Sequence, residues 1–265
     1  MHTASILQNG KVLVAGGFCC ESTTELYDPS TGMWTYTGEL AVRRSFHTAT
    51  ILKNGKVLVS GGSFVGTVTE LYDPSEGTWA STGRLHYERN GHTASLLKNG
   101  KVLVTGGIGD AQNSAELYNP SKGLWANTGS MHQKRIYHTV TVLKDGKVLV
   151  TGGFNDSFPD RTAELYDPST ETWTFTDSMH YGRSSHQATL LTNGKVLVTG
   201  GFGSVDTKIT ELYDPSAETW TITDSMHYER RRHTATVLKN GKVLVTGGYN
   251  EQALNKAELF YLKKK

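Results

Sequence analysis

The stretch that decides the fold runs from Arg135 to Gly153 and reads Arg-Ile-Tyr-His-Thr-Val-Thr-Val-Leu-Lys-Asp-Gly-Lys-Val-Leu-Val-Thr-Gly-Gly. It consists of an apolar run, an Asp-Gly pair, a second apolar run and a double glycine. An Asp-Gly or Asn-Gly pair between two β-prone runs predicts a β-hairpin with a type I′ turn, which needs positive φ at both central residues. The same unit occurs six times, with its turns at Asn9-Gly10, Asn54-Gly55, Asn99-Gly100, Asp145-Gly146, Asn193-Gly194 and Asn240-Gly241.

The hairpin is part of a longer repeat of 45 to 48 residues that fills the 265-residue chain. A histidine marks the start of each copy, and the second glycine follows 15 residues later in all six. All variation in length falls between the double glycine and a later glutamate. The repeat leaves no room for a second domain, so the sequence predicts a single domain over 1–265. The predicted repeats cover residues 2–46, 47–91, 92–137, 138–185, 186–232 and 233–262.

Each copy predicts four strands. They are the apolar run after the histidine, the Lys-Val-Leu-Val run, the Glu-Leu-Tyr run and the run around a tryptophan. The second run is continuously apolar, which indicates a strand buried on both faces. Sheets of this kind repeated six times predict an all-β, six-bladed β-propeller of four-stranded antiparallel blades, with the tryptophans and tyrosines between neighbouring blades. No tryptophan follows Glu258, so we expect the last blade to be three-stranded.

The motif set over residues 2–262 resembles the Kelch repeat. It comprises His-Thr-Ala-Thr, Val-Leu-Val-Thr-Gly-Gly, Glu-Leu-Tyr-Asp-Pro and a spaced tryptophan. The resemblance implies a propeller whose first strand is innermost, and a non-enzymatic scaffold for protein binding. The sixth copy departs from the pattern, because no Asp-Pro turn follows its Glu-Leu-Phe-Tyr run.

In an up-and-down blade, the loop between the second and third strands lies on the same face as the link to the next blade. The length variation of the repeat falls in the loop between the second and third strands. Local sequence irregularities fall in the link to the next blade, just before the histidine. A rigid repeated scaffold with its differences on one face is typical of a binding surface. We therefore expect ligands to bind at this face, at the mouth of the propeller channel.

The links carry more arginine and lysine than glutamate. Because the planar guanidinium suits carboxylates and phosphates, we expect an acidic protein or peptide segment, or a small anionic or sugar ligand. An alternative is that the arginines three residues before each histidine are architectural and pair with the repeated glutamates or with carbonyls. The unrepeated side chains are then the better candidates for contact. The candidate binding residues are Arg44, Phe46, Arg89, Arg135, Tyr137, His138, Arg183, Arg230, Arg231 and Arg232.

An enzyme is the competing hypothesis. Tyr137-His138 resembles the Tyr-His copper-ligand pair of galactose oxidase, a protein with similar repeats. That resemblance also requires a cysteine cross-linked to a tyrosine at inner-strand starts, where this chain has histidines; Cys19-Cys20 lie in a variable loop. We therefore expect no catalytic residue, metal or cofactor. A carbohydrate-active or copper-dependent oxidase-like enzyme at the channel mouth remains the alternative.

Composition narrows the class of protein further. A formal net charge of +2 does not favour nucleic acid as a partner, and two adjacent cysteines build no disulfide framework. No run of about 18 apolar residues predicts a membrane span, and no signal peptide is evident. The lack of both segments weakly favours the cytoplasm without deciding the compartment. We also expect a monomer.

Overall fold

The computed structural model describes residues 2–17, 22–63, 66–109, 112–203 and 207–261. The chain divides into two compact units, Met1–Ser130 and Met131–Lys265, and the boundary lies within the third predicted repeat, 92–137. The prediction of a single domain stays a prediction. Within the described ranges, no helix is long and apolar enough to cross a membrane.

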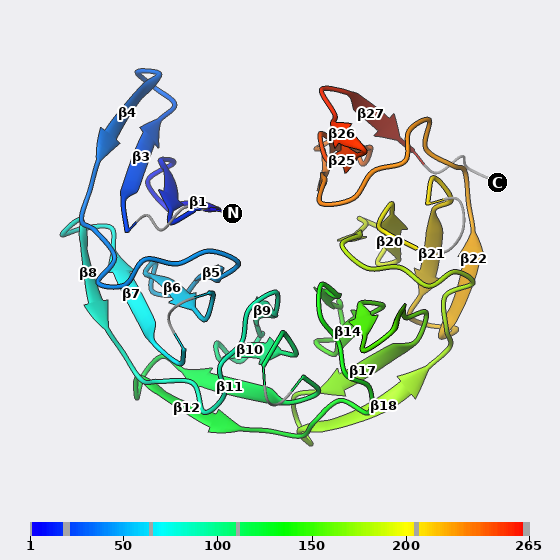
Figure 1. The fold of residues 1–265 in the computed structure, drawn as a ribbon, viewed down its shortest axis with the longest axis horizontal. Coiled ribbons are helices and arrows are strands. Elements are labelled where there is room, and N and C mark those ends of the chain that lie inside the picture. Colours follow the sequence, from blue (N-terminus) through cyan, green and yellow to red (C-terminus); the bar gives the residue numbers. More distant parts are fainter. Residues whose placement is uncertain (1, 18–21, 64–65, 110–111, 204–206, 262–265) are drawn as a thin grey trace. The chain divides into compact units, whose positions relative to one another are not determined.

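The first unit consists of three four-stranded antiparallel sheets, in each of which consecutive strands are neighbours (Figure 1). The first sheet is β1 (Thr3–Ile6), β2 (Val12–Ala15), β3 (Thr24–Asp28) and β4 (Met33–Tyr36). The second is β5 (Thr48–Ile51), β6 (Val57–Ser60), β7 (Thr69–Asp73) and β8 (Thr78–Ser81). The third is β9 (Thr93–Leu96), β10 (Val102–Thr105), β11 (Ala115–Asn119) and β12 (Leu124–Asn127).

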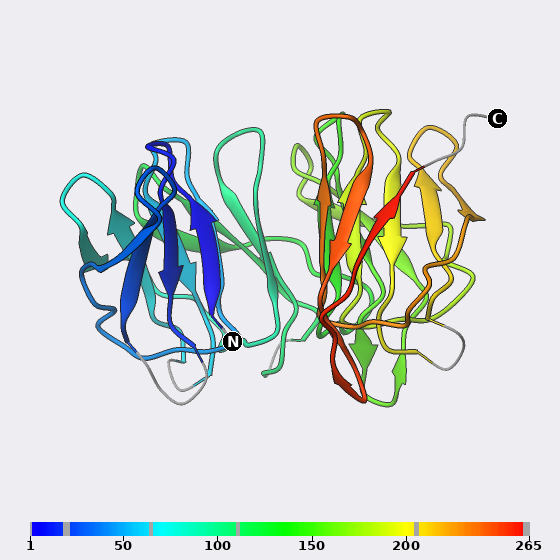
Figure 2. The same cartoon turned by 90° about the horizontal axis from the view of Figure 1, so that it is seen from above.

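The second unit has two four-stranded sheets and one three-stranded sheet, besides two small hairpins, and Figure 2 shows their strands along their length. The fourth sheet is β13 (Thr139–Val142), β14 (Val148–Thr151), β17 (Ala163–Asp167) and β18 (Thr172–Thr176). The fifth is β19 (Gln187–Leu190), β20 (Val196–Thr199), β21 (Glu211–Asp214) and β22 (Thr219–Ile222). The sixth is β23 (Thr234–Val237), β24 (Val243–Thr246) and β27 (Ala257–Phe260). Two variable loops form small hairpins, β15 (Phe154–Asn155) with β16 (Phe158–Pro159), and β25 (Tyr249–Asn250) with β26 (Gln252–Ala253).

These six sheets are the blades of a six-bladed β-propeller, and we number them blade 1 to blade 6 in chain order. The all-β class, the antiparallel four-stranded blades and the three-stranded last blade are confirmed. The repeated Lys-Val-Leu-Val run forms the second strand of each blade. That strand is buried along its whole length in β6, β10, β14 and β20, as its continuous apolar sequence predicts.

The hairpin turns differ from the type I′ turn that the sequence predicts. In the first repeat Gly10 has a φ of 82°, whereas Asn9 is not among the residues with positive φ. The Gly10 N–H donates to the Leu7 carbonyl, and the Leu7 N–H donates to the Lys11 carbonyl. This is a three-residue loop in which a type I turn ends on a left-handed glycine. Asn9 keeps ordinary backbone angles, and its Oδ1 accepts from the Lys11 N–H.

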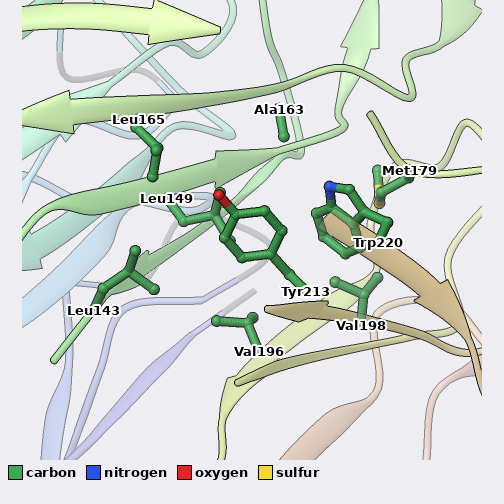
Figure 3. Packing of buried hydrophobic residues seen from close by; sticks show 9 residues of the cluster. All are labelled: Leu143, Leu149, Ala163, Leu165, Met179, Val196, Val198, Tyr213 and Trp220. Atoms are coloured by element: carbon green, nitrogen blue, oxygen red, sulfur yellow. The ribbon is translucent and has the colours of Figure 1, made fainter. Parts of the chain in front are cut away.

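The core lies between neighbouring blades of each unit. Figure 3 shows the packing between blades 4 and 5, where Leu143 and Leu149 face Val196, Tyr213 and Trp220. In each of the first five blades a tyrosine and a tryptophan on paired outer strands contact each other, with ring centroids 4.9 to 5.1 Å apart. The tryptophans of blades 3, 4 and 5 are buried, as predicted, but Trp34 of blade 1 is 53% exposed.

Candidate functional site

The links and the variable loops lie side by side in both units. From His47 onward, the residue two positions before each repeated histidine forms an isolated antiparallel bridge with the first residue after the double glycine. We call the surface formed by these two kinds of segment the link face. The bridges are Ser45 with Ser63, Asn90 with Ile108, Ile136 with Phe154, Ser184 with Phe202, and Arg231 with Tyr249.

The five repeated arginines do not contribute their charge to this face. Each guanidinium is buried and lies 2.5 to 2.9 Å from the repeated glutamate of its blade. A second guanidinium nitrogen donates to the carbonyl of the first residue of the double glycine, for example from Arg183 to Gly200 at 2.9 Å. The pairs are Arg44 with Glu70, Arg89 with Glu116, Arg135 with Glu164, Arg183 with Glu211, and Arg230 with Glu258.

Each glutamate also accepts hydrogen bonds from the link. The backbone N–H of His180 lies 2.6 Å from one oxygen of Glu211, and the Nδ1 atom of the same histidine lies 2.9 Å away. We call this arrangement of arginine, glutamate and link backbone the clamp. It supports the architectural alternative, because a guanidinium held in this way fixes the link to the blade and cannot reach a partner. We therefore leave Arg44, Arg89, Arg135, Arg183 and Arg230 out of the contact surface.

The repeated histidines from His47 onward are also internal, whereas His2 is exposed. His138 is 4% exposed, so its ring belongs to the interior rather than to the contact surface. His186 and His233 place Nε2 within 2.8 to 2.9 Å of the hydroxyls of Thr139 and Thr199 in the preceding blade. Burial and the nearby Arg230 lower the pKa of His233 to about 4, and burial lowers the pKa of His186 well below its ordinary value. These imidazoles are therefore neutral hydrogen-bonding groups between blades.

The residue immediately before each repeated histidine from His47 to His233 has an unusual backbone conformation. Phe46, Tyr137, Ser185 and Arg232 have φ between 53° and 55°, and Gly91 occupies the equivalent position with a φ of 61°. This left-handed conformation is unfavourable by about 1 to 2 kcal/mol for a residue with a side chain, and it is rare for bulky ones. Residues with strained backbone conformations are often found at functional sites.

Hydrogen bonds between neighbouring links hold this conformation in place. The Ser185 N–H donates to the Tyr137 carbonyl at 2.8 Å, and the Arg232 N–H donates to the Ser185 carbonyl at 2.9 Å. Gly91 donates to Phe46 in the same way in the first unit. The strained positions thus form a continuous backbone row within each unit, and their side chains are the ones that differ most between repeats.

In the second unit, aromatic rings and arginines gather on the link face. The Arg231 guanidinium carbon lies 5.2 Å from the ring centroid of Phe202 and 5.2 Å from that of Tyr249. Arg232 lies 5.7 Å from the Tyr137 ring. Contacts of this length are favourable cation–π interactions, worth about 0.5 to 1 kcal/mol at exposed sites. We call Phe202, Arg231 and Tyr249 the arginine cage.

A pocket of about 410 Å³ opens beside the arginine cage. All three cage residues line it, together with the carboxylate residues Glu229 and Glu251. Within the described residues, the Arg231 guanidinium has no hydrogen-bond acceptor, so its N–H edges are available to a ligand. The pocket therefore offers a planar cation held between two rings, with carboxylates at its margin.

The structure brings together only part of the predicted set. Arg231, Arg232 and Tyr137 lie on the link face of the second unit, whereas Phe46 belongs to the first unit. Phe202 and Tyr249, which complete the arginine cage, are not among the residues predicted from the sequence. Their position was a usable signal, since both are the first residue after a double glycine and that residue pairs with the link in blades 2 to 6.

Of the pair Tyr137-His138, which the oxidase alternative invokes, the histidine is interior. His138 is buried beside its clamp, and the described ranges hold no group of three or more His, Cys, Asp or Glu side chains able to bind a metal. Cys19 and Cys20 lie outside the described residues.

Two comparisons with known proteins bear on identity. The family model described as the KLHDC2/KLHL20/DRC7 Kelch-repeats domain matches residues 67–248. A comparison with curated proteins finds no match.

Proposed function

The chain belongs to the Kelch-repeat family, and we propose that it is a non-enzymatic interaction module that binds a segment of a partner protein on the link face of its second unit. Kelch-repeat domains generally bind protein partners. The arginine cage is the observation that carries the proposal. A half-buried guanidinium that contacts two rings is restricted in orientation, and no side chain or carbonyl of the described residues accepts a hydrogen bond from it.

The cage favours an acidic side chain of the partner as its ligand. A carboxylate can accept two parallel hydrogen bonds from the edge of a guanidinium, and stacking on Phe202 and Tyr249 has already removed much of the freedom of Arg231. Glu229 and Glu251 line the same pocket and would repel a run of acidic residues. We therefore propose a segment in which a carboxylate stands next to a hydrogen-bond donor or a basic residue.

Tyr137 and Arg232 extend the proposed surface along the link row. The cation–π contact between them presents a second guanidinium beside an aromatic face. Aromatic and arginine side chains are the residue types that most often dominate the energetics of protein interfaces. The proposed contact set is thus Tyr137, Phe202, Arg231, Arg232 and Tyr249. We keep the expectation that the protein is a monomer.

The test is selection of 12-residue peptides from a displayed random library on the whole chain, followed by titration of the selected peptides. Arg231→Ala is expected to weaken their binding by about tenfold or more, the effect of losing a central contact. Lys239→Ala is the control, because it removes one positive charge from an exposed hairpin turn at the opposite end of blade 6. Equal losses for the two variants, or selected peptides without carboxylates, would contradict the proposal.

A further inference from the structure

Blade 6 ends on a strand whose outer edge has no neighbour in the described part of the chain. Its sheet has the order β23-β24-β27, whereas each of the other five blades has a fourth, outermost strand. β27 pairs through Leu244 with Leu259 and through Val243 with Phe260 on its inner side. Its other row of backbone groups faces outward, and a free row of this kind can pair with an added strand.

The other blades show what such a strand would carry. Their outer strands place a tryptophan opposite the third-strand tyrosine, as in the Tyr213–Trp220 register pair. In blade 5 the two ring centroids lie 5.0 Å apart, and Trp220 packs against Leu143, Leu149 and other core residues. Phe260 stands at the tyrosine position of blade 6.

A groove is present where the sixth tryptophan would lie. It has a volume of about 1130 Å³ and lies between blades 5 and 6. Leu191, Leu212 and Phe260 line it, and they belong to a core cluster whose members all occupy positions equivalent to residues of the cluster around Trp220. The groove is therefore shaped for a large side chain delivered by an outer strand.

A specific hydrogen-bond partner for that side chain is in place. Trp79 Nε1 donates to Thr24 Oγ1 in the preceding blade at 3.3 Å, and Trp125 Nε1 donates to Thr69 Oγ1 at the same distance. Thr210 occupies the same position in blade 5, directly before the clamp glutamate, and is fully buried. An indole in the groove would therefore meet the Thr210 hydroxyl.

Charge adds a further requirement. In blades 1, 2 and 5 the lysine before the second strand forms an ion pair with the aspartate that ends the third strand, as in Lys195–Asp214 at 2.8 Å. In blade 6 the equivalent Lys242 lines the groove and lies 5.4 Å from the ring centroid of Tyr261 instead. Its ammonium has no carboxylate partner within the described residues. An acidic residue at the start of an added strand would complement it.

We propose that the outer edge of β27 is a second binding site, which accepts an extended segment of a partner protein in antiparallel register. The segment carries a tryptophan opposite Phe260 and an acidic residue shortly before it. Main-chain hydrogen bonds to β27 supply affinity, and the groove selects the tryptophan. The site is distinct from the arginine cage and does not depend on the function proposed for the cage.

The test uses the outer strand of blade 5 as the probe. A fluorescein-labelled peptide of residues 214–224, Asp-Pro-Ser-Ala-Glu-Thr-Trp-Thr-Ile-Thr-Asp, is titrated with the whole chain and followed by fluorescence anisotropy. Saturable binding with one peptide per chain is expected. Replacing the tryptophan of the peptide by alanine should weaken binding by about tenfold or more, because an aromatic anchor in a pocket dominates such interfaces.

Backbone methylation separates strand pairing from simple hydrophobic adsorption. In blade 5 the Thr223 N–H donates to the Thr210 carbonyl across the strand pair. The two-residue period of a strand therefore turns the N–H of residue 221 toward the partner strand and that of residue 222 away from it. A peptide N-methylated at 221 should bind about tenfold more weakly or worse, and one methylated at 222 should bind nearly as well as the parent.

One protein variant tests the predicted indole contact. Thr210→Val keeps the side-chain shape and should weaken the tryptophan peptide while leaving a phenylalanine version unaffected, since phenylalanine has no N–H to donate. The Arg231→Ala variant should bind the peptide with unchanged affinity, because the β27 site does not include the arginine cage. Lack of saturable binding, or equal affinity for the tryptophan and alanine peptides, would overturn the proposal. So would an oligomer in analytical ultracentrifugation that the peptide does not dissociate, because a second copy would then occupy the edge.

Discussion

Replacing Glu211 by glutamine removes the charge from one clamp while leaving its shape nearly unchanged. The carboxylate accepts from Arg183 at 2.9 Å, from the His180 N–H at 2.6 Å and from the Tyr181 N–H at 3.2 Å. An amide presents one oxygen and one NH₂ group, so at least one of these donors must face another donor. Arg183 is buried and would keep its charge without a counter-ion.

The expected loss of stability is about 3 kcal/mol. Losing one partner of a buried ion pair destabilises proteins by about 3 to 5 kcal/mol, and glutamine belongs at the lower end because its oxygen still accepts one bond. With a urea dependence of about 1 to 3 kcal/mol per molar, the midpoint of unfolding should fall by at least about 1 M. Urea unfolding of the whole chain, followed by tryptophan fluorescence, measures this shift.

The chain contains its own matched control. Glu25 occupies the same strand position in blade 1, paired with Val14 and Tyr36. Its carboxylate has no arginine or other hydrogen-bond donor among the described residues, and its side chain is only half-buried. Glu25→Gln should therefore change stability by no more than about 0.5 kcal/mol. Similar losses for the two variants would refute the clamp as the source of the stability.

Three further predictions concern protonation, packing and strain. The pKa of His233 is about 4 in the folded protein and about 6.5 when unfolded. Unfolded chains therefore bind more protons, and the free energy of unfolding should fall by about 2 kcal/mol between pH 7 and pH 5. Urea titrations should show a smaller pH dependence in His233→Gln, and an unchanged pH dependence would contradict the assignment. Trp220→Ala should destabilise the protein by about 3 to 5 kcal/mol, because the side chain is only 5% exposed. Trp34→Ala should cost less than about 1 kcal/mol, because that side chain is 53% exposed. Thermal unfolding compares the two variants, and equal losses of stability would refute the packing argument. Tyr137→Gly introduces the residue found at the equivalent position Gly91. It should change stability by less than about 1 kcal/mol, because relief of the left-handed φ offsets the lost contact with Arg232. Binding of the selected peptides should nevertheless weaken, and an unchanged peptide affinity would remove Tyr137 from the contact set.

Most of the fold was predictable because the same four-strand motif recurs along the sequence in six copies, the last without its fourth strand. Fixed distances between histidine, double glycine and glutamate identify the strands, and the continuously apolar second run indicates burial on both faces. The turn type was the main local error. An Asn-Gly pair is compatible with both a two-residue and a three-residue loop, and hydrogen bonds such as Leu7 to Lys11 select the longer one.

The candidate site was predictable only in part. The clamp was open to prediction, because arginine and glutamate recur together and are separated by 26 to 29 residues in every pair. Regular recurrence indicated architecture, and the structure agrees. The arginine cage was not predicted, since Phe202 and Tyr249 stand in loops of unequal length, and only the bridges between loop and link place them beside Arg231.

The direction of the contacts between blades has a consequence for biosynthesis. Each clamp arginine leaves the ribosome 26 to 29 residues before its glutamate, so the charge is neutralised as soon as the third strand of the same blade is made. Trp79 and Trp125 then donate back to threonines of the blade before their own. In these contacts each new blade donates to an acceptor in a blade that has already been synthesised. Translation from the N-terminus thus supplies the partners in the order in which folding uses them.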